Sequence, residues 1–240
     1  PLHVDDHVHG DRPVIVAPPP AALSASPARI ELVGAGAHAI RVTNPARVAV
    51  VVDAGLAGYG LDLRGRPRIV VRRDPAVRVS VAPGRVALGP GASATIVVST
   101  AVGAHARPGD HGVLVLLATR RLAGAGVAIR MQVGIPVLVR VAGAVVRRLA
   151  VRGVRVQGPR RLDVMLRNGG NVIERVGRET LRIVLRRGGR VLATLRPASR
   201  ELLPGARGIV EARYPAQLHG RVTASVELAG RKAVFRIRLP

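Results

Sequence analysis

The sequence predicts an all-β fold class, and three observations carry the prediction. The same order of expected strands and turns occurs twice in the 240 residues. In each copy an alternating strand ends at an Asn turn, a Pro-Gly turn precedes another strand, and a strand that begins with Gly follows. Hydrophobic residues make up 48% of the chain but aromatic residues only 1%, so the core must consist of Val, Leu, Ile and Ala, which suit pleated strands. Between residues 28 and 240 no helical period is sustained. Short strands at this spacing predict two tandem immunoglobulin-like β-sandwich domains with a disordered N-terminal tail.

Residues 1–26 are predicted to form that flexible tail. Their Pro-rich and small-residue composition, as in VIVAPPPAALSAS at 14–26, cannot support a packed core. The chain begins at Pro1, which is compatible with a signal peptide that has been removed.

The first sandwich is predicted to span residues 27–143. Strands are expected at 29–32, 39–44 and 46–56, because apolar residues alternate there and Asn44-Pro45 breaks the second one. The segments 112–122 and 126–141 should form a long hairpin, and Pro136 marks an edge or a bulge in its second arm.

The second sandwich is predicted to span residues 144–240. Gly188-Gly189 between two alternating segments indicates a two-residue hairpin, with Arg182 and Arg186 facing water and Ile183 and Leu185 facing the core. The last strand, 233–239, alternates strictly and should point Phe235, Ile237 and Leu239 inward. The only helical turn expected lies at 199–203.

The formal charge of +24 is the largest signal in the composition. A surface this cationic concentrates polyanions such as wall polymers, anionic lipid headgroups or nucleic acid. The alternative is codon bias, because Lys232 is the only lysine among 38 basic residues. Sequence-specific binding of nucleic acid is not expected, since three aromatic residues are too few for base stacking and no helix-based motif is present.

No apolar run is long enough to cross a membrane, so a membrane anchor is expected only outside this chain. The sequence contains no cysteine, and stability must therefore come from burial and from hydrogen bonds between strands.

One group of residues in the tail has the composition of a metal site. Imidazole and carboxylate groups together bind zinc or copper, and the tail supplies them from His3, Asp5, His7 and His9, with Asp6 beside them. The competing interpretation is a flexible terminus whose ligands would lose entropy on ordering.

No cofactor and no catalytic residue is predicted. The segment 34–39, with Gly34, Gly36 and Ala39, matches the dinucleotide fingerprint in form, but the next residues predict a strand and not the helix that the pyrophosphate needs. A hydrolase would need a nucleophile, an imidazole and an acid brought together, and the serines lie in strand or turn contexts without a nucleophile elbow. Asp110 and His111 are interpreted as turn residues, and the protein is predicted not to be an enzyme.

Several segments resemble a known family. The first module, through PARIEL at 27–32, VTNPARVAV at 42–50 and RPGDHGVLVLLAT at 107–119, is similar to the peptidoglycan-binding part of the WxL-interacting surface proteins of Gram-positive bacteria. LRNGGNV at 166–172 and ELLPGARG at 201–208 resemble that family's host-binding part. The resemblance implies an extracellular, cell-wall-associated protein. The departures are the lack of Trp and the arginine excess.

The leading hypothesis is therefore a non-enzymatic cell-surface adhesion or scaffold protein. It would attach to peptidoglycan or another anionic cell-wall polymer through exposed arginines and present its second domain to a protein partner. The alternative is a periplasmic chaperone-like assembly factor that binds a client by strand addition, since two tandem immunoglobulin-like modules suit that function as well. A third hypothesis is a metal-carrying surface protein that uses the N-terminal tail.

Overall fold

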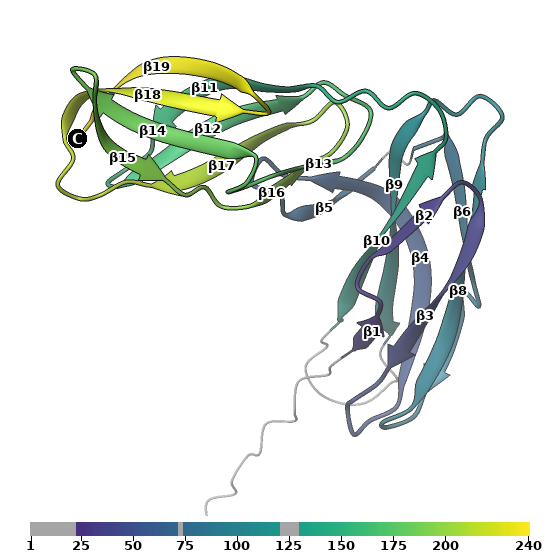
Figure 1. Ribbon diagram of the computed structural model, residues 1–240. Coiled ribbons are helices and arrows are strands. Elements are labelled where there is room, and N and C mark those ends of the chain that lie inside the picture. The colour runs from purple at the N-terminus through teal and green to yellow at the C-terminus, as the bar shows by residue number, and fades with distance from the viewer. Residues whose placement is uncertain (1–22, 72–73, 121–129) are drawn as a thin grey trace, which may run out of the picture.

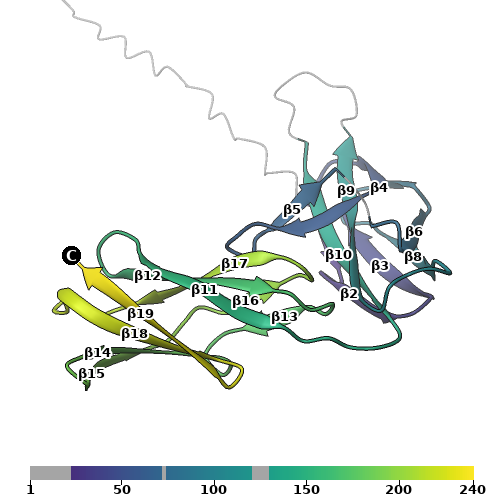
Figure 2. The same cartoon turned by 90° about the horizontal axis from the view of Figure 1, so that it is seen from above.

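The computed structural model describes residues 23–71, 74–120 and 130–240, and they form strands, turns and loops without a helix. No described segment is therefore a helix that could cross a membrane. Two β-sandwich modules meet at the corner of an L (Figure 1), and the view from above shows the same two bodies (Figure 2). The prediction of an all-β fold with two immunoglobulin-like sandwiches is confirmed.

The first module consists of two sheets that lie face to face. One has the order β1-β3-β8-β6, and the other has the order β2-β10-β9-β4-β5, with β7 also paired to β4. The strands are β1 (Ser24–Ser26), β2 (Ile30–Val33), β3 (Gly36–Thr43), β4 (Val50–Leu61), β5 (Pro67–Val70), β6 (Val77–Ala82), β7 (Arg85–Leu88), β8 (Ser93–Val102), β9 (Gly109–Arg120) and β10 (Gln132–Val141).

The second module has one four-stranded sheet, β15-β14-β18-β19, opposite a three-stranded sheet, β11-β12-β17, and a short pair, β13-β16. Its strands are β11 (Leu149–Val156), β12 (Arg161–Asn168), β13 (Glu174–Val176), β14 (Leu181–Arg187), β15 (Arg190–Leu195), β16 (Arg200–Leu202), β17 (Arg207–Arg213), β18 (Gly220–Leu228) and β19 (Arg231–Leu239).

Each module has its own aliphatic core. In the first, Ile40, Ile96 and Leu117 are fully buried between the sheets. In the second, Leu162, Ile183 and Leu185 take the same role, and Phe235 and Ile237 pack against them from β19. The inward-facing positions predicted for Ile183, Leu185 and Leu239 agree with this packing. Because most strands contribute branched aliphatic side chains at alternate positions, both cores are mainly aliphatic, and the second also includes Tyr214.

Two buried asparagines hold equivalent turns in the two modules. The Asn44 amide donates to the Val48 carbonyl oxygen at 2.8 Å, and its Oδ1 accepts from the Ala46 N–H at 3.1 Å. Asn168 repeats both contacts at the same spacing, with Val172 at 2.8 Å and Gly170 at 2.9 Å. Both side chains are fully buried. The repeat seen in the sequence is therefore a repeat of hydrogen bonding as well.

Several local expectations need correction. Ser24–Ser26, within the range predicted as tail, form β1, because they pair with β3 along Arg41–Thr43. The predicted helical turn at 199–203 is wrong, since Arg200–Leu202 is strand β16 and pairs with β13. Residues 34–35 form a turn between β2 and β3, and no helix follows them. Asp110 and His111 are not turn residues but lie in β9, paired with β10.

Candidate functional site

The first half of β10 is an exposed sheet edge. On one side β10 pairs with β9 over its whole length, from Gln132 to Val141. On the other side β2 pairs with it in parallel only from Val137 to Arg140. Among the described residues, no strand pairs with the other side of the backbone at 132–136. The expectation that Pro136 marks a strand edge agrees with this arrangement, because proline has no N–H to donate to a partner.

The register shows which backbone groups point outward along this edge. The Thr119 N–H donates to the Met131 carbonyl oxygen at 2.9 Å, so 131 and 119 form a closely hydrogen-bonded pair. In an antiparallel ladder such pairs alternate, and the residues between them direct both backbone groups to the opposite side. Gln132 and Gly134 therefore present an N–H and a carbonyl outward, whereas the Pro136 carbonyl faces the Ile30 N–H where the pairing with β2 begins. We call residues 132–136 the β10 edge.

The β10 edge borders a cleft between the two modules. This cleft has a volume of about 1010 Å³. Gly134 and Pro136 line it from β10, Tyr59 lines it from β4, and Arg175 and Glu201 line it from the second module. In Figure 1, β10 and β2 lie on the concave side of the L, whereas β6 and β8 lie on its outer side. The small residues of β10 leave its cleft face open.

A network of four charged side chains joins the modules at this cleft. Arg29, between β1 and β2, donates to both carboxylate oxygens of Glu201 on β16, at 2.9 and 2.7 Å. Arg175 of β13 donates to the same carboxylate at 2.9 Å, and Glu31 forms an ion pair with Arg29 at 2.6 Å. Such charge-assisted hydrogen bonds are stronger than neutral ones.

The electrostatics of the network keep its charges in place. Burial of Glu201 favours the neutral acid, but hydrogen bonds from Arg29 and Arg175 outweigh it and hold the pKa of this carboxyl below its ordinary value. Burial likewise opposes the charge of Arg29, and the contacts with Glu201 and Glu31 raise its pKa nonetheless. Burial raises the pKa of the neighbouring Tyr59, and the negative charge of Glu201 adds to the effect. Glu201 is thus an anion and Tyr59 a neutral phenol near pH 7.

A second set of contacts joins the modules where β9 begins. The Asp110 N–H donates to the Asn171 carbonyl oxygen at 2.8 Å, and the Asn171 amide donates to the Pro108 carbonyl oxygen at 2.9 Å. Gly109, which lies between Pro108 and Asp110, is buried and has φ of +128°. A Cβ at this position would lie 2.1 Å from the Asn171 carbonyl oxygen. Only glycine allows so close an approach. We call Pro108, Gly109, Asp110 and Asn171 the β9 clamp.

The side chain of Asp110 adds to the β9 clamp. Its Oδ2 accepts the N–H of Ile173 in the second module at 2.7 Å, and Arg140 donates to both of its oxygens at 2.6 and 2.7 Å. Burial raises the pKa of Asp110, but the contacts with Arg140 and Ile173 outweigh it, so that the pKa is lowered. A third link is the Ile209 N–H, which donates to the Leu63 carbonyl oxygen at 2.6 Å. These links connect the two modules.

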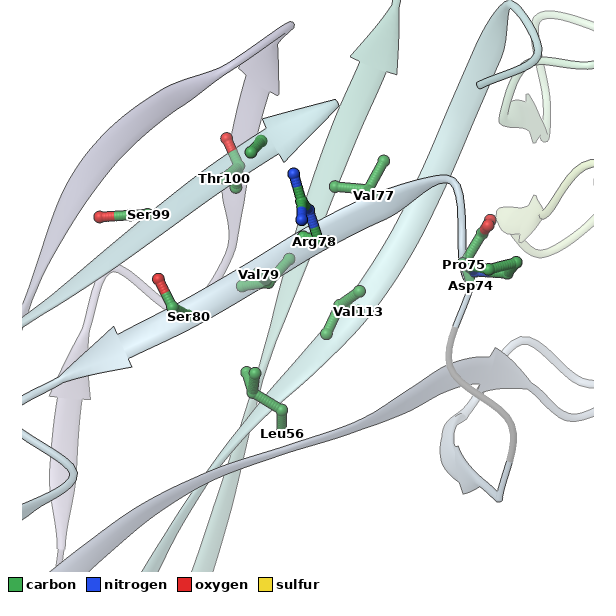
Figure 3. Close-up of a pocket in the computed structure, with 11 residues that line it drawn as sticks. Leu56, Asp74, Pro75, Val77, Arg78, Val79, Ser80, Ser99, Thr100 and Val113 are labelled. Carbon is green, nitrogen blue, oxygen red and sulfur yellow. The ribbon is translucent and has the colours of Figure 1, made fainter. Parts of the chain in front are cut away.

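A second hollow lies within the first module, between β6 and β9 (Figure 3). Its lining is mainly aliphatic, with Val77, Val79 and Val113, and it includes the hydroxyls of Ser80 and Ser99. Figure 3 shows these serines at one end and Asp74 at the other. The Asp74 carboxylate is bonded to His111 at 2.6 Å, and no histidine lines the hollow among the described residues. A nucleophile activated by a base is not assembled there.

The residues predicted as metal ligands, His3, Asp5, His7 and His9, lie outside the described residues, as does most of the predicted tail. Within the described ranges no group of three or more His, Cys, Asp or Glu residues is placed to hold a metal. The other histidines are dispersed: His38 is exposed on β3, His105 and His219 lie in loops, and His111 pairs with Asp74. The prediction of a metal site in the tail stays a prediction.

Comparisons with known proteins concern the fold. No protein-family model and no curated protein matches the sequence. Among solved structures, the class 5 fimbriae chaperone CfaA has a TM-score of 0.51 at 10% identity, covering 91% of this chain and 99% of that one. A structure titled as a chaperone-tip adhesin complex in CFA/I fimbriae biogenesis also has a TM-score of 0.51, at 12% identity and the same coverage. The chain therefore has the two-module fold of these chaperones.

This result overturns the leading functional prediction. The hypothesis of a cell-wall scaffold that binds peptidoglycan or another wall polymer is wrong, because the two-module fold matches chaperones of fimbriae over nearly the whole chain. The predicted partner, a cell-wall polymer or peptidoglycan, is therefore wrong as well. The turn motifs that suggested wall binding are structural, as Asn44 and Asn168 show, and occur wherever such turns are built. The resemblance to the WxL-interacting family stays an untested prediction.

Proposed function

We propose that the protein is a non-enzymatic assembly chaperone that binds a client protein by strand addition at the β10 edge. The observation that supports this most directly is the pair of outward-facing residues Gln132 and Gly134, whose backbone groups lie beside the cleft. Strand addition uses main-chain hydrogen bonds for affinity, and Gln132 and Gly134 offer two donors and two acceptors along this edge. The likeness to fimbrial chaperones supports a subunit of a surface fibre as the client and the periplasm as the compartment.

The rigid cleft has a physical role in this proposal. A client strand that pairs with the β10 edge gains little if the two modules must first be ordered, because each immobilised segment costs conformational entropy. The Arg29–Glu201 network and the β9 clamp remove that cost in advance. The cleft walls then contact the client beyond its paired strand.

Co-expression tests the proposal. The proteins encoded next to this chain would be produced with it in a bacterial periplasm, and the amount that co-purifies would be measured. Gln132→Pro removes an outward N–H and places a ring where the client strand must approach, so we expect recovery to fall at least tenfold. Ile69→Pro is the matched control. It changes an exposed residue on β5, the opposite edge of the same sheet, whose N–H also points away from its neighbour.

Two results would refute strand addition at this edge. One is equal recovery with Gln132→Pro and with the unchanged chain. The other is equal loss with both proline variants, since loss at β5 as well would indicate damage to the sheet. Thermal unfolding of both variants shows whether either has lost its fold.

A further inference from the structure

Five arginines gather at the end of the second module, at a distance from the cleft. They line a shallow groove of about 430 Å³ and come from three neighbouring strands: Arg186 and Arg187 of β14, Arg221 of β18, and Arg236 and Arg238 of β19. We call them the arginine groove. The turn after β14 and the C-terminal end of β19 lie at the tip of the module that points away from the first one (Figure 1). The groove shares no residue with the cleft.

The strand register places like charges against one another in this groove. Arg221 lies directly opposite Arg238. Arg186 and Arg236 flank Thr223 in the adjacent row. Directly opposed side chains on neighbouring strands have Cβ atoms about 5 Å apart, where like charges destabilise the sheet. The fold therefore carries an electrostatic cost here, which an anion would remove.

In the part of the chain that the structure describes, no acidic side chain lines the groove. The ion pairs found among the described residues include none of the five arginines. Arg186 donates to the carbonyl oxygen of Gly189 at 3.2 Å, and Arg187 donates to that of Arg221 at 3.3 Å. Glu227, the acid of β18, lies opposite Arg182 and Lys232, nearer the other end of the sheet. Arg187 also donates to the carbonyl oxygen of His219. Arg221, Arg236 and Arg238 are exposed.

The geometry points to this face as a site that docks the protein on a membrane surface rich in anionic phospholipid. The cations spread over three strands, so they match a two-dimensional array of headgroups better than a single acidic segment of a protein. Val191 and Val234, next to the groove on β15 and β19, are 48% and 58% exposed and would contact the interface. Because the groove lies at the far tip, a docked molecule keeps its cleft open to a client.

Vesicle sedimentation tests this inference with the full chain. The probes are vesicles of phosphatidylcholine alone and vesicles that also contain phosphatidylglycerol. The groove variant carries Arg186→Gln, Arg221→Gln and Arg236→Gln, and the control carries Arg41→Gln, Arg47→Gln and Arg78→Gln, which removes the same charge from exposed arginines of the first module. Each cation near an anionic surface changes binding about fivefold, so the groove variant should bind about a hundredfold more weakly. The control should change by only a few-fold.

The expected pattern is binding to the anionic vesicles alone, with selective loss in the groove variant. Equal loss in both variants would overturn the inference, because it would show attraction by net charge without a site. Absence of binding by the unchanged chain would overturn it directly. Capture of soluble polyglutamate through the same arginines without vesicle binding would assign the groove to an acidic protein segment. Thermal unfolding verifies folding, and the groove variant should be no less stable, since repulsion has been removed.

Discussion

Substitution of Gly109 by alanine is the sharpest perturbation of the β9 clamp. The residue has φ of +128°, where an L side chain is strained by roughly 1–3 kcal/mol. The added Cβ would also lie 2.1 Å from the Asn171 carbonyl oxygen, so that the 171 backbone must move away. That movement breaks the 2.8 Å hydrogen bond from the Asp110 N–H and leaves its partners unsatisfied, at a cost of about 1–3 kcal/mol. The two effects together predict a loss of roughly 2–6 kcal/mol in the free energy of unfolding.

Gly91→Ala is the matched control for backbone strain alone. Gly91 has φ of +69°, and nothing lies within 4 Å of a Cβ placed there. Its cost should be about 1–2 kcal/mol, the penalty for a left-handed alanine. The difference between the two variants therefore measures the contact between the modules.

Urea unfolding followed by circular dichroism gives both free energies, and small-angle X-ray scattering gives the relative placement of the modules. We expect Gly109→Ala to unfold at clearly lower urea and to show a broader range of module orientations, whereas Gly91→Ala keeps the L shape. The reasoning is refuted if the two variants differ by less than about 0.5 kcal/mol, which is within the additivity error for independent sites.

Three further predictions concern the other links. Arg29→Ala and Glu201→Ala, alone and combined, should show a coupling of about 1–2 kcal/mol in a double-mutant cycle by urea unfolding, because Nη1 of Arg29 contacts both carboxylate oxygens but the pair is partly exposed. Additive effects of the two substitutions would contradict this prediction. The pKa values of Glu201 and Asp110 in the folded protein lie below their ordinary 4.5 and 3.8. The stability that these two carboxylates contribute is therefore complete above the ordinary values and is lost as pH falls through the folded-state pKa. Thermal unfolding between pH 7 and 2 should show this loss of stability, and Glu201→Gln should make the loss smaller. Asn168→Ala and Asn44→Ala should each lower the free energy of unfolding by about 3 kcal/mol in the same urea assay, because each buried amide satisfies several backbone groups. A loss below about 1 kcal/mol would be inconsistent with these hydrogen bonds.

The fold could be predicted from the sequence because its signals are local. Alternation places Ile183 and Leu185 in the core, Gly188-Gly189 forms the hairpin turn, and Asn44 and Asn168 end corresponding strands. Each signal depends on residues within a few positions of one another. Periodicity of 2 and turn chemistry are therefore sufficient for the fold class.

The candidate site could not be predicted in the same way, because its parts are distant in sequence. Arg29 and Glu201 are 172 residues apart, and nothing near either residue indicates the other. Asp is common in turns, and the local sequence therefore favours a turn at Asp110. Its contact with the second module is visible only in the structure, where Asn171 packs against Gly109 and the Ile173 N–H donates to the Asp110 carboxylate. Pro136 was the one local signal of the exposed edge. Its meaning depends on where β2 stops pairing, which no local pattern shows.

Hydrogen exchange on the β10 edge tests the central claim most directly. The amide protons of Gln132 and Gly134 point outward, so they should exchange rapidly in the free protein and become strongly protected in the complex with a co-purified client. The amide proton of Ile69, on the opposite edge of the sheet, should exchange at the same rate in both states. Unchanged exchange at 132 and 134 in a stable complex, with protection appearing elsewhere, would contradict the assignment of the client strand to this edge.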